Sequence, residues 1–275
     1  MSTETPHRHR GAWWRLLASE MTLMLGRRRN QIGLVILAAV PIIIAVALRG
    51  DSGSTGMVGG LTNGLVVPLV ALVVESAFFL PLAVSMLSGD AISGEANQGT
   101  LRYVLTVPVG RTRLLLAKFV SLMLGALIGV GLIMVVGAVA GVAALGAGPS
   151  ATLSGTQISF GQTLLRLLMV AGYLTVMMWA VTAIGIFFST LIGQPMAVTV
   201  AVMVVVVLML ISQNFTQLDW LHPWTITHWI PNAVDLMRDP PYWSNVARGA
   251  GLAAGYIVVF GSAAWAHFNN KDITS

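Results

Sequence analysis

The residues best suited to form ionic contacts with another molecule are concentrated in one polar segment, Ser88–Lys118. It holds six of the 25 charged residues, in a chain that is only 9% charged: Asp90, Glu95, Arg102, Arg111, Arg113 and Lys118. Carboxylate, guanidinium and ammonium groups can form ion pairs and charge-assisted hydrogen bonds. A long apolar run stands on each side, and a polar insertion of this length is too costly to place inside a bilayer. The pattern predicts a surface segment that contacts a soluble partner.

Motifs for catalysis or metal binding are absent from the sequence. The chain has no cysteine, which excludes disulfides, thiolate metal sites and cysteine nucleophiles. It has no Gly-x-x-x-x-Gly-Lys-Ser/Thr loop, no His-Glu-x-x-His and no Gly-x-Ser-x-Gly. His222 and His228 lack a carboxylate at helical spacing that would complete a ligand set, so no metal site is expected. The sequence indicates a protein that is not an enzyme, and any ATP must be hydrolysed by another chain.

Composition indicates a polytopic, all-α integral membrane protein. Hydrophobic residues make up 56% of the chain, and the mean hydropathy is +0.82, which one soluble core could not bury. Six apolar runs are close to or exceed the length of roughly 20 residues that a spanning helix needs. The predicted spans are Gln31–Leu48, with a kink at Pro41, and then Leu61–Leu87, Leu114–Leu145, Leu164–Phe188, Pro195–Ile211 and Val246–Phe268.

The basic residues predict the orientation of these spans. With both termini in the cytoplasm, eleven Lys and Arg lie inside: Arg8, Arg10, Arg15, Arg27, Arg28, Arg29, Arg102, Arg111, Arg113, Lys118 and Lys271. Four lie outside: Arg49, Arg166, Arg238 and Arg248. Cytoplasmic loops of membrane proteins carry the excess of positive charge. The net charge of +5 is therefore explained without nucleic acid, and segment 88–118 is expected in the cytoplasm.

The order of residues in this segment is that of a known family. Glu95-x-x-x-Gly99-Thr100-Leu101-Arg102, followed by Pro108-x-x-Arg111 and by Lys118 entering the next span, resembles the permease subunits of type 2 ATP-binding-cassette exporters. The resemblance implies a single permease domain over residues 1–275. It also implies a second permease copy or sister permease, and two cytoplasmic ATPases that bind ATP and Mg²⁺. Segment 88–118 would be the coupling element that docks on the ATPase.

Within that element, individual roles are predicted from residue chemistry. Asp90 to Gln98 can form a short coupling helix that ends at Gly99. Glu95 and Arg102 would contact the ATPase or each other, and Pro108 with Gly110 would form a turn. For three basic residues, anchoring at the lipid headgroups and contact with the partner both remain open: Arg111, Arg113 and Lys118.

Residues 1–30 are expected to form a cytoplasmic tail and an interfacial helix. In Ala12–Leu25, Leu17 and Met21 fall on one helical face, together with Trp14 and Met24, and Arg15, Ser19 and Thr22 on the opposite face. Such a helix suits the membrane surface, and the family has one at this place. The expected interface anchors are Trp13, Trp14, Arg27, Arg28 and Arg29.

An aromatic segment, 212–245, precedes the last span. It holds four of the eight Trp residues, Trp220, Trp224, Trp229 and Trp243. Aromatic residues of this kind gather at membrane interfaces, and several prolines interrupt any long helix. Short helices at the extracytoplasmic surface are therefore predicted, as the family resemblance also implies.

Glu75 is the one acidic residue well inside an apolar run. A carboxylate near mid-bilayer costs on the order of 2.5–3.5 kcal/mol, so it should face a polar pathway or a partner group. A substrate path and a hydrogen bond to a Ser, Thr or Asn of another helix are equally compatible with the sequence.

The function favoured by this reading is a permease subunit of an ATP-driven exporter of hydrophobic or amphipathic substrates. The excess of Arg, 13 against 2 Lys, fits a bacterial plasma membrane protein. Two alternatives stay open. One is a mechanical subunit that passes force to an extracytoplasmic partner, and the other is a secondary transporter, for which inverted repeats and charged midplane residues are expected but not evident.

Overall fold

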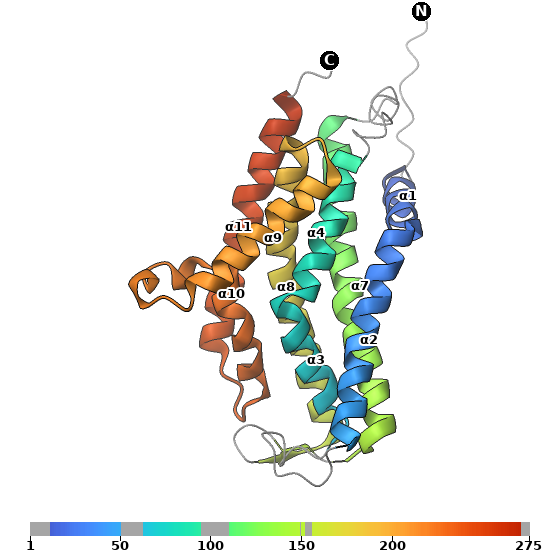
Figure 1. Cartoon of the computed structure of the whole chain (residues 1–275), viewed down its shortest axis with the longest axis vertical. Helices are drawn as coiled ribbons and strands as arrows, with labels where there is room; N and C mark the ends of the chain where they lie inside the picture. The colour runs from blue at the N-terminus through green and yellow to red at the C-terminus, as the bar shows by residue number, and fades with distance from the viewer. Residues whose placement is uncertain (1–11, 51–62, 95–109, 149, 152–155, 271–275) are drawn as a thin grey trace, which may run out of the picture.

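The computed structural model describes residues 12–50, 63–94, 110–148, 150–151 and 156–270. In this part of the chain five helices are long and apolar enough to cross a membrane: α2 (Arg28–Gly50), α7 (Arg111–Leu145), α8 (Phe160–Leu191), α9 (Pro195–Ser212) and α11 (Trp243–Asn270). A bent pair, α3 (Val66–Ala77) and α4 (Phe79–Ala91), makes a sixth crossing if it counts as one span. The helices form one bundle (Figure 1), as expected for a multi-pass, all-α membrane protein.

The second span is broken, whereas the sequence predicted a bend in the first. Helix α2 continues without interruption through Pro41, but α3 and α4 meet at Phe78 with a bend of 56°. Pro81 lies in the first turn of α4. It has no N–H to donate to the carbonyl of Ala77, and its ring would clash with that carbonyl in a continuous helix. The break places Pro81 where a helix tolerates proline.

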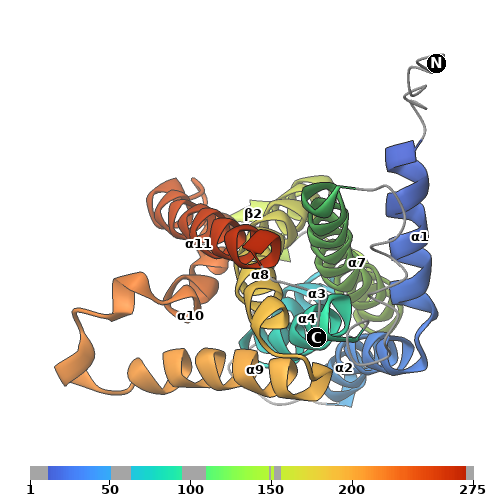
Figure 2. The same ribbon diagram turned by 90° about the horizontal axis from the view of Figure 1, so that it is seen from above.

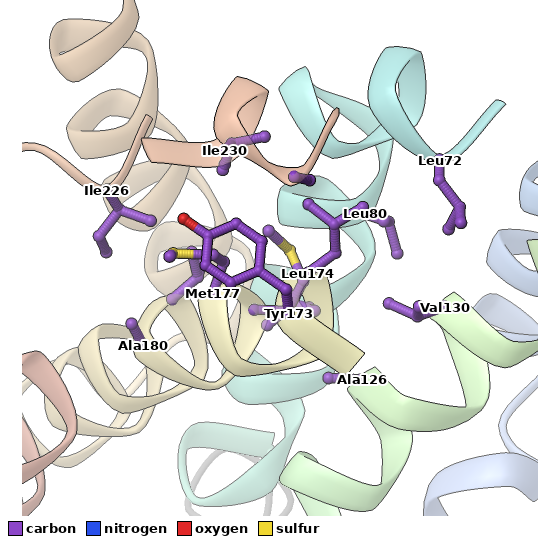
Figure 3. Packing of buried hydrophobic residues seen from close by; sticks show 14 of the residues in the cluster. Leu72, Leu80, Ala126, Val130, Tyr173, Leu174, Met177, Ala180, Ile226 and Ile230 are labelled. Atoms are coloured by element: carbon purple, nitrogen blue, oxygen red, sulfur yellow. The ribbon is translucent and has the colours of Figure 1, made fainter. Parts of the chain in front are cut away.

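Helix α8 forms the centre of the bundle. A Ser159–Gln162 capping box starts it, and its long apolar sequence has no polar face, as expected of a helix buried on all sides. Tyr173, Leu174 and Met177 pack against side chains of neighbouring helices, as Figure 3 shows. The Tyr173 hydroxyl donates a hydrogen bond of 2.8 Å to the carbonyl of Trp229. This core ties the short helices before α11 to the bundle.

Helices α3 and α7 pack closely because α7 carries glycine at the contact. A Cβ added to Gly141 would overlap the backbone of Gly64, and one added to Gly137 would lie 2.8 Å from Cα of Pro68. Small residues at this spacing let membrane helices approach one another. This glycine pair therefore serves packing inside one chain.

Three further parts complete the fold. Helix α1 (Ala12–Gly26) runs across one end of the bundle rather than along it (Figure 2). Between α9 and α11 the chain projects to the side and forms short helices, η1 (Thr216–Leu218), η2 (His222–Trp224), α10 (Ile226–Trp229) and η3 (Ile230–Met237). A short antiparallel pair, β1 (Ser150–Ala151) and β2 (Gln157–Ile158), links α7 to α8.

Candidate functional site

The candidate site is the end of the bundle that carries both flanks of segment 95–109. We call it the polar end; it comprises the α1–α2 junction, the last turns of α4, α8 and α11, and the first turns of α7 and α9. All of these lie at the top of Figure 1 and face the viewer in Figure 2. Ion pairs and hydrogen bonds connect these helix ends. The contacts made by the residues just before and just after segment 95–109 decide which helices would move if the segment were displaced.

The flank before the segment is bound to the end of α8. Ser93 Oγ lies 3.0 Å from Ser189 Oγ and donates to the carbonyl of Ile192 at 2.6 Å. The backbone N–H groups of Ile92 and Ser93 both donate to Ser189 Oγ, at 3.2 and 3.1 Å. Gly185 lets α4 come this close, because a Cβ there would lie 2.5 Å from Ser88. The start of the segment is thus fixed to the α8–α9 connection.

Asp90 lies one turn earlier and pairs with the α1–α2 junction. Its carboxylate oxygens are 3.4 Å from Arg27 Nη1 and 3.6 Å from Arg29 Nη1. Arg29 also donates to Thr199 Oγ1 on α9 at 3.1 Å. The predicted role of Asp90 as an ATPase contact remains a prediction. Within this chain its carboxylate joins α4 to α2, and through Arg29 to α9.

The flank after the segment is bound to different helices. Arg111 donates to the carbonyl of Asn269 near the end of α11 at 3.1 Å. Trp265 Nε1 donates to Thr112 Oγ1 at 3.1 Å, and the Arg113 guanidinium lies 5.9 Å from the ring centroid of Trp13 on α1. Arg111 and Arg113 are exposed in the first turn of α7. The helix therefore starts at Arg111, before the predicted start of the span at Leu114.

Lys118 differs from these two basic residues. Its side chain is only 2% exposed, and its Nζ lies 3.0 Å from Glu20 Oε2 on α1. This burial does not fit the expected contact of Lys118 with lipid headgroups. Glu20 is not among the residues predicted from the sequence, although it falls one turn from Leu17 and Met24, both on the face predicted to be apolar. Glu20 is a single acid on that apolar face, and Lys118 is a single basic residue in an apolar span. These two isolated opposite charges are the pattern from which the pair could have been predicted.

The structure describes some of the other predicted residues but not all of them. Trp14 and Arg28 are exposed on α1 and α2, as an anchor at the membrane surface requires. Six residues of the predicted coupling element lie outside the described part of the chain, and their roles stay predictions: Glu95, Gly99, Thr100, Leu101, Arg102 and Pro108.

Glu75 lies in the last turn of α3, directly before the break at Phe78. It is fully buried, and among the described residues neither of its carboxyl oxygens has a hydrogen-bond partner. Of the two alternatives that the sequence left open, the hydrogen bond to a Ser, Thr or Asn of another helix is not formed among the described residues. Since a buried carboxyl without a partner is costly, this position is a second candidate for function.

The projecting segment between α9 and α11 exposes several aromatic side chains, including Trp220 at 70%. His222 and His228 stack with ring centroids 6.1 Å apart. Asp219 Oδ1 lies 3.5 Å from Nδ1 of His222, three residues later, so the expectation that no carboxylate stands at helical spacing was wrong. Burial, and secondarily the neighbouring His222, lowers the pKa of His228 below its usual value of 6.5, so its ring is mainly neutral at pH 7. In the described residues no group of three His, Asp or Glu could hold a metal.

Comparison with known proteins identifies the family. The sequence profile of ABC-2 family transporter proteins matches residues 24–273, nearly the whole chain. The chain is 34% identical over 122 residues to a probable ABC transporter permease protein NosY of Stutzerimonas stutzeri, and 36% identical over 101 residues to the protein of that name in Pseudomonas aeruginosa. These stretches cover 43% and 34% of this chain, and 42% and 37% of the relatives.

The matched region spans less than half of either relative, so the family assignment rests on the profile. That profile includes the polar end, the broken span with Glu75 and the projecting aromatic segment. A multi-pass helical bundle with this sequence pattern is a membrane subunit of an ABC transporter. The chain belongs to the ABC-2 transporter family.

Proposed function

We propose that this chain is the permease subunit of an ATP-driven exporter, in which segment 95–109 docks on a separate ATPase. The observation that supports the proposal is the attachment of the two flanks of the segment to different helices. Ser93 is bound to the α8–α9 connection, and Arg111 to the end of α11. A displacement of the segment would therefore act on both sides of the bundle at once.

The proposed mechanism is rigid-body rocking of helices driven from the polar end. Two ATPases would bind ATP and Mg²⁺, close on each other and push the segment of each permease chain. The Asp90 pairs with Arg27 and Arg29 would carry the push to α2 and α9. The substrate would cross between this chain and a second permease copy or a sister permease, and a hydrophobic or amphipathic substrate fits the apolar helices. The setting is a bacterial plasma membrane with both termini in the cytoplasm.

A mechanical role is the second candidate, and the projecting segment favours it. Phe215, Trp220, Trp224, Tyr242 and Trp243 expose between 50% and 70% of their surface, and exposed aromatic side chains are typical of binding surfaces. In that case a partner outside the membrane would bind the segment, and no solute would cross. ATP-driven substrate uptake into inverted vesicles that contain only the permease and the ATPase would contradict the mechanical role.

The test of ATPase docking is charge reversal at Glu95. We expect Glu95→Lys to leave the chain in the membrane and to lower the ATPase recovered with it by about fivefold or more, since like charges placed at an interface repel partners. The matched control is Asp219→Lys, which reverses an exposed acid in the projecting segment and should leave the recovery unchanged. Normal recovery and normal substrate-stimulated hydrolysis in the Glu95→Lys complex would overturn the docking role.

A further inference from the structure

An apolar groove runs between α2 and α4, beginning at the polar end. Its volume is about 300 Å³, the lower limit of typical small-molecule pockets at roughly 300–1,000 Å³. Arg29 stands at one end and is the only charged residue in its lining. Ile36 from α2 and Phe79 from α4 line its walls further along, and both are more than one-third exposed, so the groove is open at the surface of the bundle.

Gly33 lies in the wall of the groove and leaves open space there. It occupies the face of α2 that looks toward α4, one turn from Arg29, and nothing lies within 4 Å of the place where its Cβ would be. A second hollow, on the side of α7, also includes Gly33 and Arg29. A larger residue at this position would close the space between the helices.

The end of the groove is positively charged. Arg27, Arg28 and Arg29 stand together at the α1–α2 junction, and Asp90 is the single acid that pairs with them in the described structure. The Arg29 guanidinium has five N–H donors, so its contacts with Asp90, Thr199 and the Met196 sulfur leave capacity for another acceptor. Its side chain is 31% exposed. An anionic group can therefore approach Arg29 while a chain attached to it lies along the groove.

We propose that this groove binds one acyl chain of an anionic membrane phospholipid, whose phosphate is held by Arg29. The dimensions fit: Arg29 to Leu37 covers about 12 Å at roughly 1.5 Å per residue, and an extended hydrocarbon chain suits an apolar channel of this length. The charge also fits, because Arg binds phosphate with paired N–H donors. To reach a lipid phosphate, Arg29 must lie at a polar boundary of the membrane, where α2 begins. This condition is the same whichever side of the membrane the polar end faces.

A helix of a second copy is a poorer occupant. With side chains a helix is roughly 10–12 Å wide, which is too wide to enter a channel of this volume. The bound lipid would also have a consequence for the polar end. Its phosphate and Asp90 would share the Arg29 guanidinium, so the lipid composition of the membrane would bear on the contact that joins α4 to α2.

The experiment is native mass spectrometry of the purified full chain, titrated with dimyristoyl phosphatidylglycerol or dimyristoyl phosphatidylcholine. We expect one phosphatidylglycerol per chain, bound at least fivefold more tightly than phosphatidylcholine. Gly33→Leu should fill the groove and weaken phosphatidylglycerol binding at least fivefold. The matched control is Gly131→Leu on α7, which also has nothing within 4 Å of its Cβ but lies outside the groove; its binding should equal that of the unaltered chain.

A third variant separates charge from shape. Arg29→Gln should remove the preference for phosphatidylglycerol while some binding of both lipids remains. Equal binding by the Gly33→Leu and Gly131→Leu variants, with both eluting as folded protein, would overturn the proposal and leave only unspecific lipid contact. Efficient disulfide formation between Ile36→Cys chains in membranes would overturn it too, since a second copy would then cover the groove; the chain has no other cysteine.

Discussion

The bundle buries two acidic residues in different ways. At the polar end, Glu20 is 13% exposed and lies 3.0 Å from the buried Nζ of Lys118. At the break of the second span, Glu75 is fully buried and has no hydrogen-bond partner among the described residues. Both carboxyl groups are removed from water, but only the first has an opposite charge beside it.

The difference separates a structural role from a functional one. A buried ion pair holds two helices in one arrangement. Removal of one partner destabilises the fold, because the remaining charge is then buried without compensation. A buried acid without a partner contributes nothing of this kind, so its retention in the fold requires another reason. Glu75 also lies at the one sharp break found in the described spans, where two half-helices can move relative to one another.

The largest effect is expected from breaking the pair on one side. Lys118→Met leaves Glu20 buried and unpaired, which should lower the free energy of unfolding by about 3 kcal/mol. For a chain of this size that corresponds to a fall in Tm of roughly 6–12 °C. The measurement is the Tm of the detergent-solubilised chain, followed by loss of the folded peak in size-exclusion chromatography.

Two further variants show whether the pair itself is responsible. Lys118→Met combined with Glu20→Leu removes both charges and should recover most of the lost stability, because no buried charge remains. Arg113→Met removes an exposed charge from the same helix and should cost about 1 kcal/mol or less. A double variant as unstable as Lys118→Met would show that packing, and not the charge, explains the loss.

A smaller effect is expected at Asp90, because its partners Arg27 and Arg29 are each 31% exposed, whereas Lys118 is only 2% exposed. Asp90→Asn keeps the shape of the side chain but removes its charge from Arg27 and Arg29. The unfolding free energy should fall by about 1 kcal/mol, and the substrate stimulation of the partner ATPase should weaken if α4 drives α2. Asp219→Asn, at a carboxylate that is mostly exposed, is the control and should change neither quantity. Unaltered stimulation in Asp90→Asn would remove the Asp90 pairs from the proposed mechanism.

The limits of five spans could be predicted because they depend on local composition. Runs of apolar residues identify α2, α7, α8, α9 and α11 to within a few residues at most ends. The bend did not follow from the same pattern. Pro41 and Pro81 both lie in apolar runs, and the apolar pattern does not distinguish the helix that breaks from the helix that continues. Pro41 is buried within a continuous helix, whereas at Pro81 the chain divides.

The polar end was less predictable for a related reason. The segment itself could be located from its charges, but the partners of its flanks are distant in sequence. Ser93 and Ser189 are 96 residues apart and Lys118 and Glu20 are 98 apart, and no periodicity connects them. The sequence therefore identified where contacts form and assigned Asp90 and Lys118 to a partner or to lipid, while the fold gives both of them partners inside the chain.

The smallest effect on stability, and the sharpest test of the comparison, is expected at Glu75. Glu75→Gln keeps the size and polarity of the side chain and removes its ability to ionise. Because no partner is lost among the described residues, the unfolding free energy should change by about 0.5 kcal/mol or less. Ser76→Ala is the control, since Ser76 is equally buried but, among the described residues, bonds only to the carbonyl of Val73 in its own helix. If Glu75 serves the transport path, the Gln variant should assemble with the ATPase normally and show altered transport or altered substrate-stimulated hydrolysis, whereas Ser76→Ala should not.

Activity measured from pH 6 to pH 9 gives the decisive readout, because only an ionisable side chain can make activity depend on its own protonation. Identical pH profiles for Glu75→Gln and the unaltered chain, with equal stability, would reduce Glu75 to a residue that fills space beside the break.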